Sequence, residues 1–577
     1  MIPAGYRRKV MASLLLFATA SCFAKTSLTY RITGFENKKA IQNAIDRLEI
    51  NEKSAGKLTP ALIQKLYLTG GGESVSAFEP YGYFHAKVTH QNLEHTGKAW
   101  VAHYKISPGI QTKITSVVVK VLGPGKGDKR IVSHLSNFHL KRGQVFNVTR
   151  YKKSRNTLLL VAQKRGYIQA KYTLDQVTVN LPKRTCKVAF TLETGPRFYF
   201  GPTHFSRSPL SDVFLKRYLT YKQGKPFSSN KLSRLQDDLG GAGYFESVSV
   251  LPELKKIKGN QVPVQVDLTK AKRQRYQIGL GFGTVSGPRV TGGVKWRWMN
   301  AYGHHFNTNF TFSQIDRNLE AQYVIPGSNP AKNNYFINAG IYTLRPRHGR
   351  SEMEKVGFGY TTNYRRWQLS TSLSRMWERY RITKQERYRN ARVLLPNFTA
   401  TYLTAPDRIK VNRGSRLTMT LQGGDEHLLS TVSFAQFIAS YKTIQTFWKD
   451  NRIVLYGNYG YTVIKDSNNL PLSLRFYTGG YGSVRGYGLQ SMGPGRFLLV
   501  GSAEYQRRVW GDIYGAVFYD IGNAFNNYSR AEKNLKRSTG VGVVWLSAVG
   551  NVSFYVAKAL SQRGQPIRLM INLGADL

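Results

Sequence analysis

The chain of 577 residues is long enough for several domains, and 84 Lys and Arg against 32 Asp and Glu give it a formal net charge of +52. A basic excess of this size indicates an anionic partner. Because the charge is spread along the whole chain and accompanies no zinc-knuckle, helix-turn-helix or RNP-like motif, we expect a membrane surface and predict no nucleic-acid partner.

The N-terminus has the composition of a secretory signal peptide. A basic segment at residues 7–9 precedes an apolar run at residues 10–18, and Ala24 ends a small-residue cleavage site. We therefore expect residues 1–24 to be a signal peptide that is removed on export. The alternative, a lipoprotein site at Cys22, lacks the leucine that usually lies three residues before such a cysteine.

After cleavage the mature chain keeps one cysteine, Cys186, so no intramolecular disulfide is expected. No later segment has the roughly twenty consecutive apolar residues of a membrane-spanning helix. A chain of this kind crosses a bilayer only as a closed β-barrel, whose strands pair all their backbone groups. The mean hydropathy of -0.36 is compatible with a barrel, because lipid-facing and lumen-facing residues alternate along each strand.

The first half contains a motif that occurs three times, each time after a helical pattern and before a short alternating strand. The three copies are Gly82-Tyr83-Phe84, Gly166-Tyr167-Ile168 and Gly243-Tyr244-Phe245. A glycine at this place typically ends a helix, and the aromatic residue after it enters the core. The repeat predicts three strand-helix-helix-strand-strand units, over residues 26–108, 109–195 and 196–270.

From about residue 271 the helical spacing gives way to strands with a period of two. In residues 305–312 phenylalanines share one face, while asparagines and threonines share the other. The same alternation of apolar and polar residues occurs in residues 567–577. The sequence predicts an all-β region over residues 271–577, and periodicity alone leaves the number of strands open.

One loop in this region places an arginine on a bendable backbone. The segment Val484-Arg485-Gly486-Tyr487 follows a glycine-rich stretch at residues 477–482. An arginine between apolar neighbours is suited to folding back into a cavity, where it requires an acidic receptor. Glu504 and Asp520, the latter followed by Gly522, are the candidates, and two carboxylates around one guanidinium form a charge-assisted anchor. The alternative is a solvated loop arginine.

The Val484–Tyr487 loop and the strand Phe518-x-Asp520-x-Gly522 resemble the signature of the outer-membrane assembly superfamily that includes BamA, TamA and two-partner secretion pores. Three repeats ahead of the barrel resemble the TamA branch, the outer-membrane subunit of the translocation and assembly module. The resemblance implies α+β POTRA (polypeptide-transport-associated) repeats followed by an all-β transmembrane barrel of sixteen antiparallel strands. Such a protein lies in the cell outer membrane with its POTRA repeats in the periplasm. Ala548 and Asn551 replace prolines that relatives usually carry.

The resemblance also implies a mechanism. The first and last barrel strands pair weakly, because glycine weakens a strand, and a client strand pairs with the freed edge. The expected seam residues are Gly279, Gly281, Gly283, Ile571, Leu573, Gly574 and Leu577. The structural alternative is that these glycines only fit a crowded barrel wall.

The implied function is insertion or translocation of clients such as autotransporters or β-barrels. The implied partners are outer-membrane lipid, unfolded client proteins and an inner-membrane-anchored, AsmA-like protein of the TamB type. The sequence has no nucleotide-binding fingerprint, nucleophile elbow or metal-ligand spacing, so we predict no enzyme activity, cofactor or metal. Two other functions stay open: a two-partner-secretion-type polypeptide export pore, and a scaffold whose repeats tether a periplasmic partner.

Overall fold

The computed structural model describes residues 26–283, 287–345, 349–405, 411–448, 450–527, 535–547 and 550–574. The expected signal peptide, residues 1–24, and Leu577 lie outside the described residues. The chain forms two compact units. The first comprises Met1–Gly201, Gln223–Asn230 and Lys256–Val262, and the second comprises Pro202–Lys222, Lys231–Lys255 and Pro263–Leu577.

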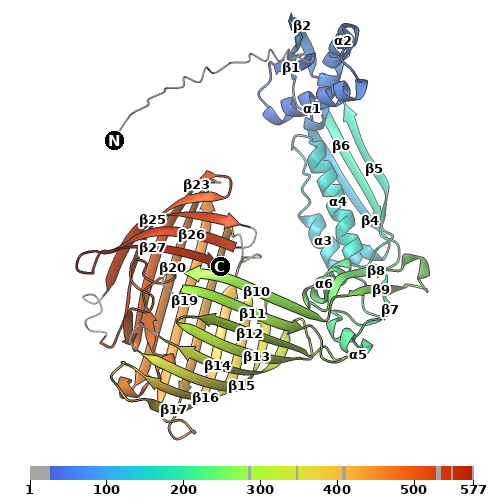
Figure 1. The fold of residues 1–577 in the computed structure, drawn as a ribbon. Helices are drawn as coiled ribbons and strands as arrows, with labels where there is room; N and C mark the ends of the chain where they lie inside the picture. Colours follow the sequence, from blue (N-terminus) through green and yellow to red (C-terminus); the bar gives the residue numbers. More distant parts are fainter. Residues whose placement is uncertain are drawn as a thin grey trace, which may run out of the picture. The chain divides into compact units, whose positions relative to one another are not determined.

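The first unit contains two α/β blocks, each with a three-stranded sheet and two helices (Figure 1). The first block consists of β1 (Ser27–Thr33), α1 (Lys38–Ala55), α2 (Pro60–Ser76), β2 (Lys87–Thr96) and β3 (Ala99–Ser107). The second block consists of β4 (Lys113–Leu122), α3 (Lys129–Ser136), α4 (Val148–Lys164), β5 (Lys171–Asn180) and β6 (Thr185–Glu193). In both sheets the last strand is central, parallel to the first strand and antiparallel to the second.

The repeated glycines lie where each block turns from helix to strand. Gly82 and Gly166 have φ angles of +88° and +98°, in the left-handed region that favours glycine. A Cβ atom at Gly82 would also lie 2.7 Å from the carbonyl oxygen of Phe146. Tyr167, the aromatic residue after Gly166, has 3% of its surface exposed. The glycine therefore makes the turn and the tyrosine fills the core, as the motif predicts.

Cys186 lies on β6 in the core of the second block, with 1% of its surface exposed. Burial raises the pKa of its thiol to about 11. At pH 7 only about one such thiol in 10⁴ is ionised, and the thiolate is the form that attacks a maleimide. We predict that mass spectrometry finds the native mature protein unlabelled at pH 7 and the denatured protein labelled. Rapid labelling of the native protein would contradict the buried position.

The second unit begins with most of a third block of the same layout. Its elements are β7 (Tyr199–Phe205), α5 (Asp212–Leu215), α6 (Ser229–Gly241), β8 (Phe245–Pro252) and β9 (Gln261–Lys270). The strand order β7-β9-β8 again places the last strand in the centre. On α6, Leu232, Leu235 and Leu239 are buried, which is the amphipathic spacing expected of a helix that covers a sheet.

The rest of the second unit is one sheet of sixteen strands, each antiparallel to its neighbours, that curls into a nearly closed barrel (Figure 1). The strands are β10 (Gln274–Gly283), β11 (Gly287–Trp296), β12 (His305–Ser313), β13 (Asp316–Pro326), β14 (Asn333–Leu344), β15 (Arg350–Tyr364), β16 (Trp367–Arg381), β17 (Arg389–Leu403), β18 (Arg413–Gly424), β19 (Phe434–Phe447), β20 (Asn451–Ile464), β23 (Phe497–Trp510), β24 (Ile513–Phe525), β25 (Lys536–Ser547), β26 (Gly550–Ala559) and β27 (Ile567–Gly574). The expectation of α/β repeats followed by sixteen antiparallel strands is confirmed.

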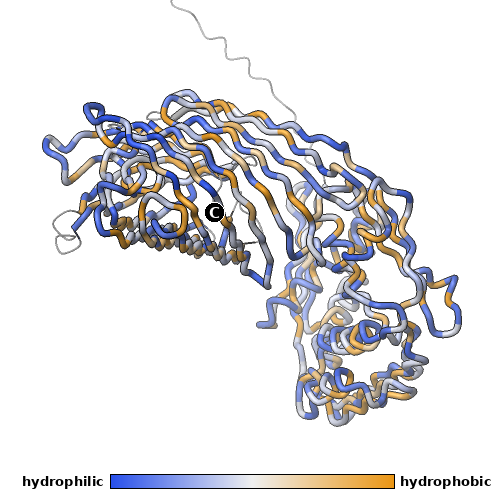
Figure 2. Tube along the Cα trace, turned by 90° about the horizontal axis from the view of Figure 1, so that it is seen from below, coloured by the Kyte–Doolittle hydropathy of each residue, from blue (hydrophilic) through white to orange (hydrophobic). Residues whose placement is uncertain are grey.

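Hydrophobic and hydrophilic residues alternate along the barrel strands (Figure 2). On β27, for example, Ile567 and Leu569 leave 65% and 55% of their surface exposed. Apolar side chains that face outward at this density are typical of a lipid-facing wall. Among the described residues, no helix combines the length and the apolar composition that crossing a bilayer requires.

We call the end of the barrel where β10 begins its base, and the opposite end its rim. At the base, the turn between β11 and β12 contacts the third block. The hydroxyl of Tyr244 donates a 2.6 Å hydrogen bond to the carbonyl oxygen of Gly303. A Cβ atom at Gly303, which has a φ of +73°, would lie 2.3 Å from the ring of Phe214 on α5. The third block is therefore fastened to the turn between β11 and β12.

At the rim, residues 465–496 connect β20 to β23 and fold back against the inner face of the barrel wall. This inner loop includes a small hairpin formed by β21 (Phe476–Thr478) and β22 (Met492–Gly495). Buried loop residues, among them Val484 and Tyr487, pack with Leu498, Val500 and Ala559 of the strands. The loop thus brings the Val484–Tyr487 motif into the barrel interior.

Candidate functional site

Two neighbouring strands place the acidic receptors on one inner face. On β23, Ser502, Glu504 and Gln506 alternate with outward residues, and on β24 Asp520 does the same. The strand register sets Ser502 opposite Asp520, and Glu504 opposite Phe518. The two carboxylates therefore lie diagonally across adjacent strands, a spacing that one guanidinium can bridge. Glu504 and Asp520 expose only 7% and 0% of their surface.

Glycines allow the inner loop to reach these carboxylates. Gly479, Gly480, Gly482 and Gly486 have φ angles of +104°, +94°, +86° and +84°, values that other residues adopt only with strain. At Gly486 a Cβ atom would also approach the backbone nitrogen of Ala559 to 3.1 Å. Glycine is thus required on both conformational and steric grounds at the residue after Arg485.

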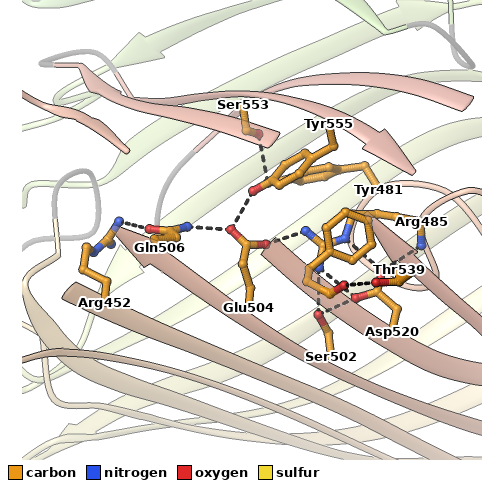
Figure 3. Close-up of polar contacts among 11 residues, drawn as sticks. Arg452, Tyr481, Arg485, Ser502, Glu504, Gln506, Asp520, Thr539, Ser553 and Tyr555 are labelled. Atoms are coloured by element: carbon orange, nitrogen blue, oxygen red, sulfur yellow. Dashed lines mark hydrogen bonds and ion pairs between the residues drawn. The ribbon is translucent and has the colours of Figure 1, made fainter. Parts of the chain in front are cut away.

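Arg485 lies between Asp520 and Glu504 (Figure 3). Its Nε donates to Oδ2 of Asp520 at 2.8 Å and its Nη2 donates to Oδ1 at 2.7 Å, a bidentate pair. Its backbone N–H donates to the same Oδ2 at 2.9 Å. Its Nη1 donates to Glu504, and its Nη2 also donates to Ser502. The buried charges are therefore paired, because both carboxylates, Glu504 and Asp520, form ion pairs with Arg485.

Aromatic rings enclose the guanidinium. The guanidinium carbon of Arg485 lies 3.5 Å from the ring centroid of Phe518 and 4.8 Å from that of Tyr555. Rings at these positions attract the cation and exclude water from its ion pairs. The hydroxyl of Tyr555 also donates to Oε1 of Glu504 at 2.7 Å. The anchor therefore joins the loop to β26 as well as to β23 and β24.

The network continues away from the loop through residues that the sequence analysis missed. Gln506 donates to Oε1 of Glu504 at 2.6 Å and accepts a 2.6 Å hydrogen bond from Nη1 of Arg452, which is completely buried (Figure 3). Ser502 and Gln506 could have been found, because they alternate with Glu504 on one strand. Arg452 and Tyr555 could not, because only the fold brings β20 and β26 to this site.

Two other motif residues have structural roles. The hydroxyl of Tyr487 donates to the carbonyl oxygen of Arg537 and accepts from the backbone nitrogen of Ser561, both at 3.2 Å. At Gly522 a Cβ atom would lie 2.6 Å from the carbonyl oxygen of Leu499. Tyr487 thus extends the loop's contacts beyond β24, and Gly522 allows close approach of β23 and β24.

A glycine in the wall makes room for the enclosing tyrosine. A Cβ atom at Gly542 on β25 would lie 2.3 Å from the Cδ1 atom of Tyr555. We predict that Gly542→Ala displaces Tyr555 and lowers stability by about 1–3 kcal/mol, the usual cost of overpacking. Heat-modifiability on gel electrophoresis measures the change. Gly515→Ala is the matched control, because the nearest atom, on Val509, is 3.6 Å away. Equal stability of the two variants would contradict the packing argument.

A second anchor, also missed by the sequence analysis, holds the start of the inner loop to another part of the wall. Glu378 on β16 has 3% of its surface exposed and accepts hydrogen bonds from the backbone nitrogen and hydroxyl of Ser473, at 3.0 and 2.5 Å. Gln436 on β19 donates to the carbonyl oxygen of Leu474 at 2.8 Å. Leu472 is completely buried beside Tyr380. The inner loop is therefore fixed at two places inside the barrel.

The seam lies between the two ends of the sheet. β10 and β27 lie near each other (Figure 1), but among the described residues no ladder joins them. Ile278 on β10 leaves 84% of its surface exposed, and Ile571 and Leu573 on β27 leave 41% and 48%. β10 therefore presents an unpaired edge, which is a template for another strand.

The expected seam glycines differ in what surrounds them. A Cβ atom at Gly279 would lie 2.6 Å from the hydroxyl oxygen of Thr291, whereas one at Gly281 would lie 3.5 Å from the nearest atom of Arg289. Gly283 pairs with Gly287, and Gly574 with Asn551. Crowding thus accounts for Gly279 but not for Gly281, and Leu577 lies outside the described residues.

The fold and the site together define a class of protein: a β-barrel with an apolar outer face, α/β domains ahead of the barrel and a loop anchored inside it. A family model described as the Omp85 superfamily domain matches residues 258–575, more than half of the chain. The chain belongs to the Omp85 superfamily. No group of three or more potential metal ligands occurs in the part of the chain that the structure describes.

Known proteins resemble the chain at low sequence identity. Outer envelope protein 80, chloroplastic, from Oryza sativa subsp. japonica is 23% identical over 337 residues, which cover 53% of this chain and 50% of the relative. The chain thus spans about half the length of this curated relative. BamA from Haemophilus ducreyi lacking POTRA domains 1-3 has a similar fold, with a TM-score of 0.66, 17% identity and coverage of 80% of this chain and 99% of that chain. CdiB from Acinetobacter baumannii gives a TM-score of 0.49 at 11% identity, covering 93% and 98%.

Proposed function

We propose that this protein inserts client polypeptides into the outer membrane, or translocates them, through the seam between β10 and β27. The unpaired edge of β10 is the observation that supports this most. A client strand that pairs with this edge satisfies its backbone groups before it meets lipid, so it avoids the cost of unpaired polar groups in hydrocarbon. This step requires no covalent chemistry.

The inner loop gives the seam a rigid border. Arg485 joins the loop to β23 and β24, and Tyr487 joins it to β25. The ring of Tyr555 on β26 lies against the guanidinium of Arg485. The last of these strands, β26, pairs with β27. Separating β10 from β27 therefore costs less free energy than separating two strands among β23 to β26, where the buried ion pairs of Arg485 would have to break.

We further propose that the three α/β blocks, over residues 26–108, 109–195 and 196–270, are POTRA repeats that lie in the periplasm and receive clients. Three such repeats support placement in the TamA branch. That placement predicts autotransporters or β-barrels as clients and an inner-membrane-anchored, AsmA-like protein of the TamB type as partner. Each small sheet has an edge strand, such as β2, to which an extended segment can be added.

A polypeptide export pore is the alternative. The two anchors of the inner loop oppose it, because Leu472 and Arg485 hold that loop inside the barrel. The rate at which an unfolded outer-membrane barrel folds into liposomes, with and without this protein, separates the two functions. Acceleration by the protein supports insertion. Absence of acceleration together with large ion conductance would replace insertion by export.

A further inference from the structure

Two positively charged side chains face each other at the base of the seam. Arg275 on β10 and Lys295 on β11 are direct register partners. Side chains in this relation have Cβ atoms about 5 Å apart, and like charges there repel. Among the described residues neither Arg275 nor Lys295 forms an ion pair. An anion between them would remove the repulsion.

Both side chains line a cavity of about 390 Å³ on the inner face of β10 to β14. The same cavity contains the amide oxygens of Asn307 and Asn338, which are buried and accept no hydrogen bond. These two acceptors lie on β12 and β14, further along the sheet than the free edge of β10. Glu320 also lines the cavity, but no ion pair connects it to either cation. The cation pair on β10 and β11 therefore has no anionic partner in the part of the chain that the structure describes.

Strand direction determines which end of a client arrives there. β10 runs from the base to the rim, and β27, at the other end of an antiparallel sheet of sixteen, runs from the rim to the base. A strand that is added antiparallel to the free edge of β10 therefore also ends at the base. Its carboxyl end lies beside Gln274 and Arg275, where β10 begins.

We propose that Arg275 and Lys295 form a receptor for the terminal carboxylate of a client's last β-strand. The guanidinium of Arg275 binds a carboxylate in bidentate fashion, and Lys295 adds a second cation. Recognition of the chain end fixes the register of the added strand, which backbone pairing alone leaves open. This inference rests on the proposed function, because it concerns the strand that enters the seam.

A pair of synthetic peptides tests the receptor. Both have the sequence of residues 567–574 and a fluorophore at the N-terminus, and one ends in a carboxylate, the other in a carboxamide. Fluorescence anisotropy measures their binding to the detergent-solubilised full-length protein. We expect the carboxamide to bind about tenfold more weakly, since it loses a charge-assisted contact. Added salt reduces this difference by screening.

Variants separate the receptor from the seam. Arg275→Gln with Lys295→Gln weakens binding of the carboxylate peptide and leaves binding of the carboxamide unchanged. Arg416→Gln, which removes a cation from β18 on another part of the wall, changes neither. Equal affinities of the two peptides for the unmodified protein would overturn the receptor and leave the proposed function standing. If neither peptide binds, strand pairing at the seam is contradicted, and with it both the carboxylate receptor and the proposed function.

Discussion

Arg485→Ala is expected to reduce the folding rate of a client in proteoliposomes at least tenfold while the barrel itself stays assembled. The substitution leaves Asp520 and Glu504, which are almost fully buried, without their cation. Removing one partner of a buried ion pair costs about 3–5 kcal/mol. The inner loop then leaves the wall of β23 to β26, and the seam loses its rigid border. Heat-modifiability measures assembly, and client folding kinetics measure activity.

Three further variants separate stability from function. Arg485→Lys keeps the charge but loses the bidentate geometry, so an intermediate rate is expected. Arg485→Met combined with Glu504→Gln and Asp520→Asn removes all three charges, which restores much of the stability but not the rate. Arg507→Ala, on the exposed part of the same β23, is the matched control and keeps full activity. A normal client folding rate in Arg485→Ala would show that the anchor has no part in the mechanism.

A disulfide across the seam is expected to lower client folding to the rate of protein-free liposomes. Tyr276→Cys near the start of β10, combined with Leu573→Cys near the end of β27, introduces one exposed thiol on each seam strand. A covalent bond there prevents the two strands from separating, and a reductant restores activity. The Cys186→Ser background removes the native buried thiol of the mature chain.

The matched control for this disulfide joins β10 to its other neighbour. Tyr276 is the register partner of Val294 on β11, so Tyr276→Cys with Val294→Cys bridges a pair that already forms a ladder. This bridge leaves the seam free, and full activity is expected. Full activity of the oxidised seam variant would exclude opening between β10 and β27.

Much of the fold could be predicted because its signals are local. Gly166 and Tyr167 mark a helix end and a core position within two neighbouring residues. The alternation in residues 305–312 marks a strand, observed as β12 (His305–Ser313). Strand number could not be obtained in this way, since an amphipathic strand has the same period in a barrel of any size. The count of sixteen followed from the family resemblance.

The candidate site could be predicted only as far as its motif residues. Arg485, Glu504 and Asp520 are recognisable because a charged residue among apolar neighbours is unusual. The contact of Tyr555 with Glu504 depends on how β26 lies relative to β23, with two strands between them in the sheet, and no local pattern encodes it. The bond from Ser473 to Glu378 joins residues even further apart in sequence. Long-range pairs of this kind depend on barrel closure, which individual strand patterns do not specify.

The most direct test of lateral insertion is site-specific photo-crosslinking to a client during its assembly. A photoreactive residue replaces either Ile278, which lies on the exposed face of the seam strand β10, or Thr420, which lies on the polar face of β18. Insertion through the seam predicts that the client's last strand crosslinks to position 278 and not to position 420. Crosslinking at position 420 alone would mean that the client passes through the lumen, and would contradict the account.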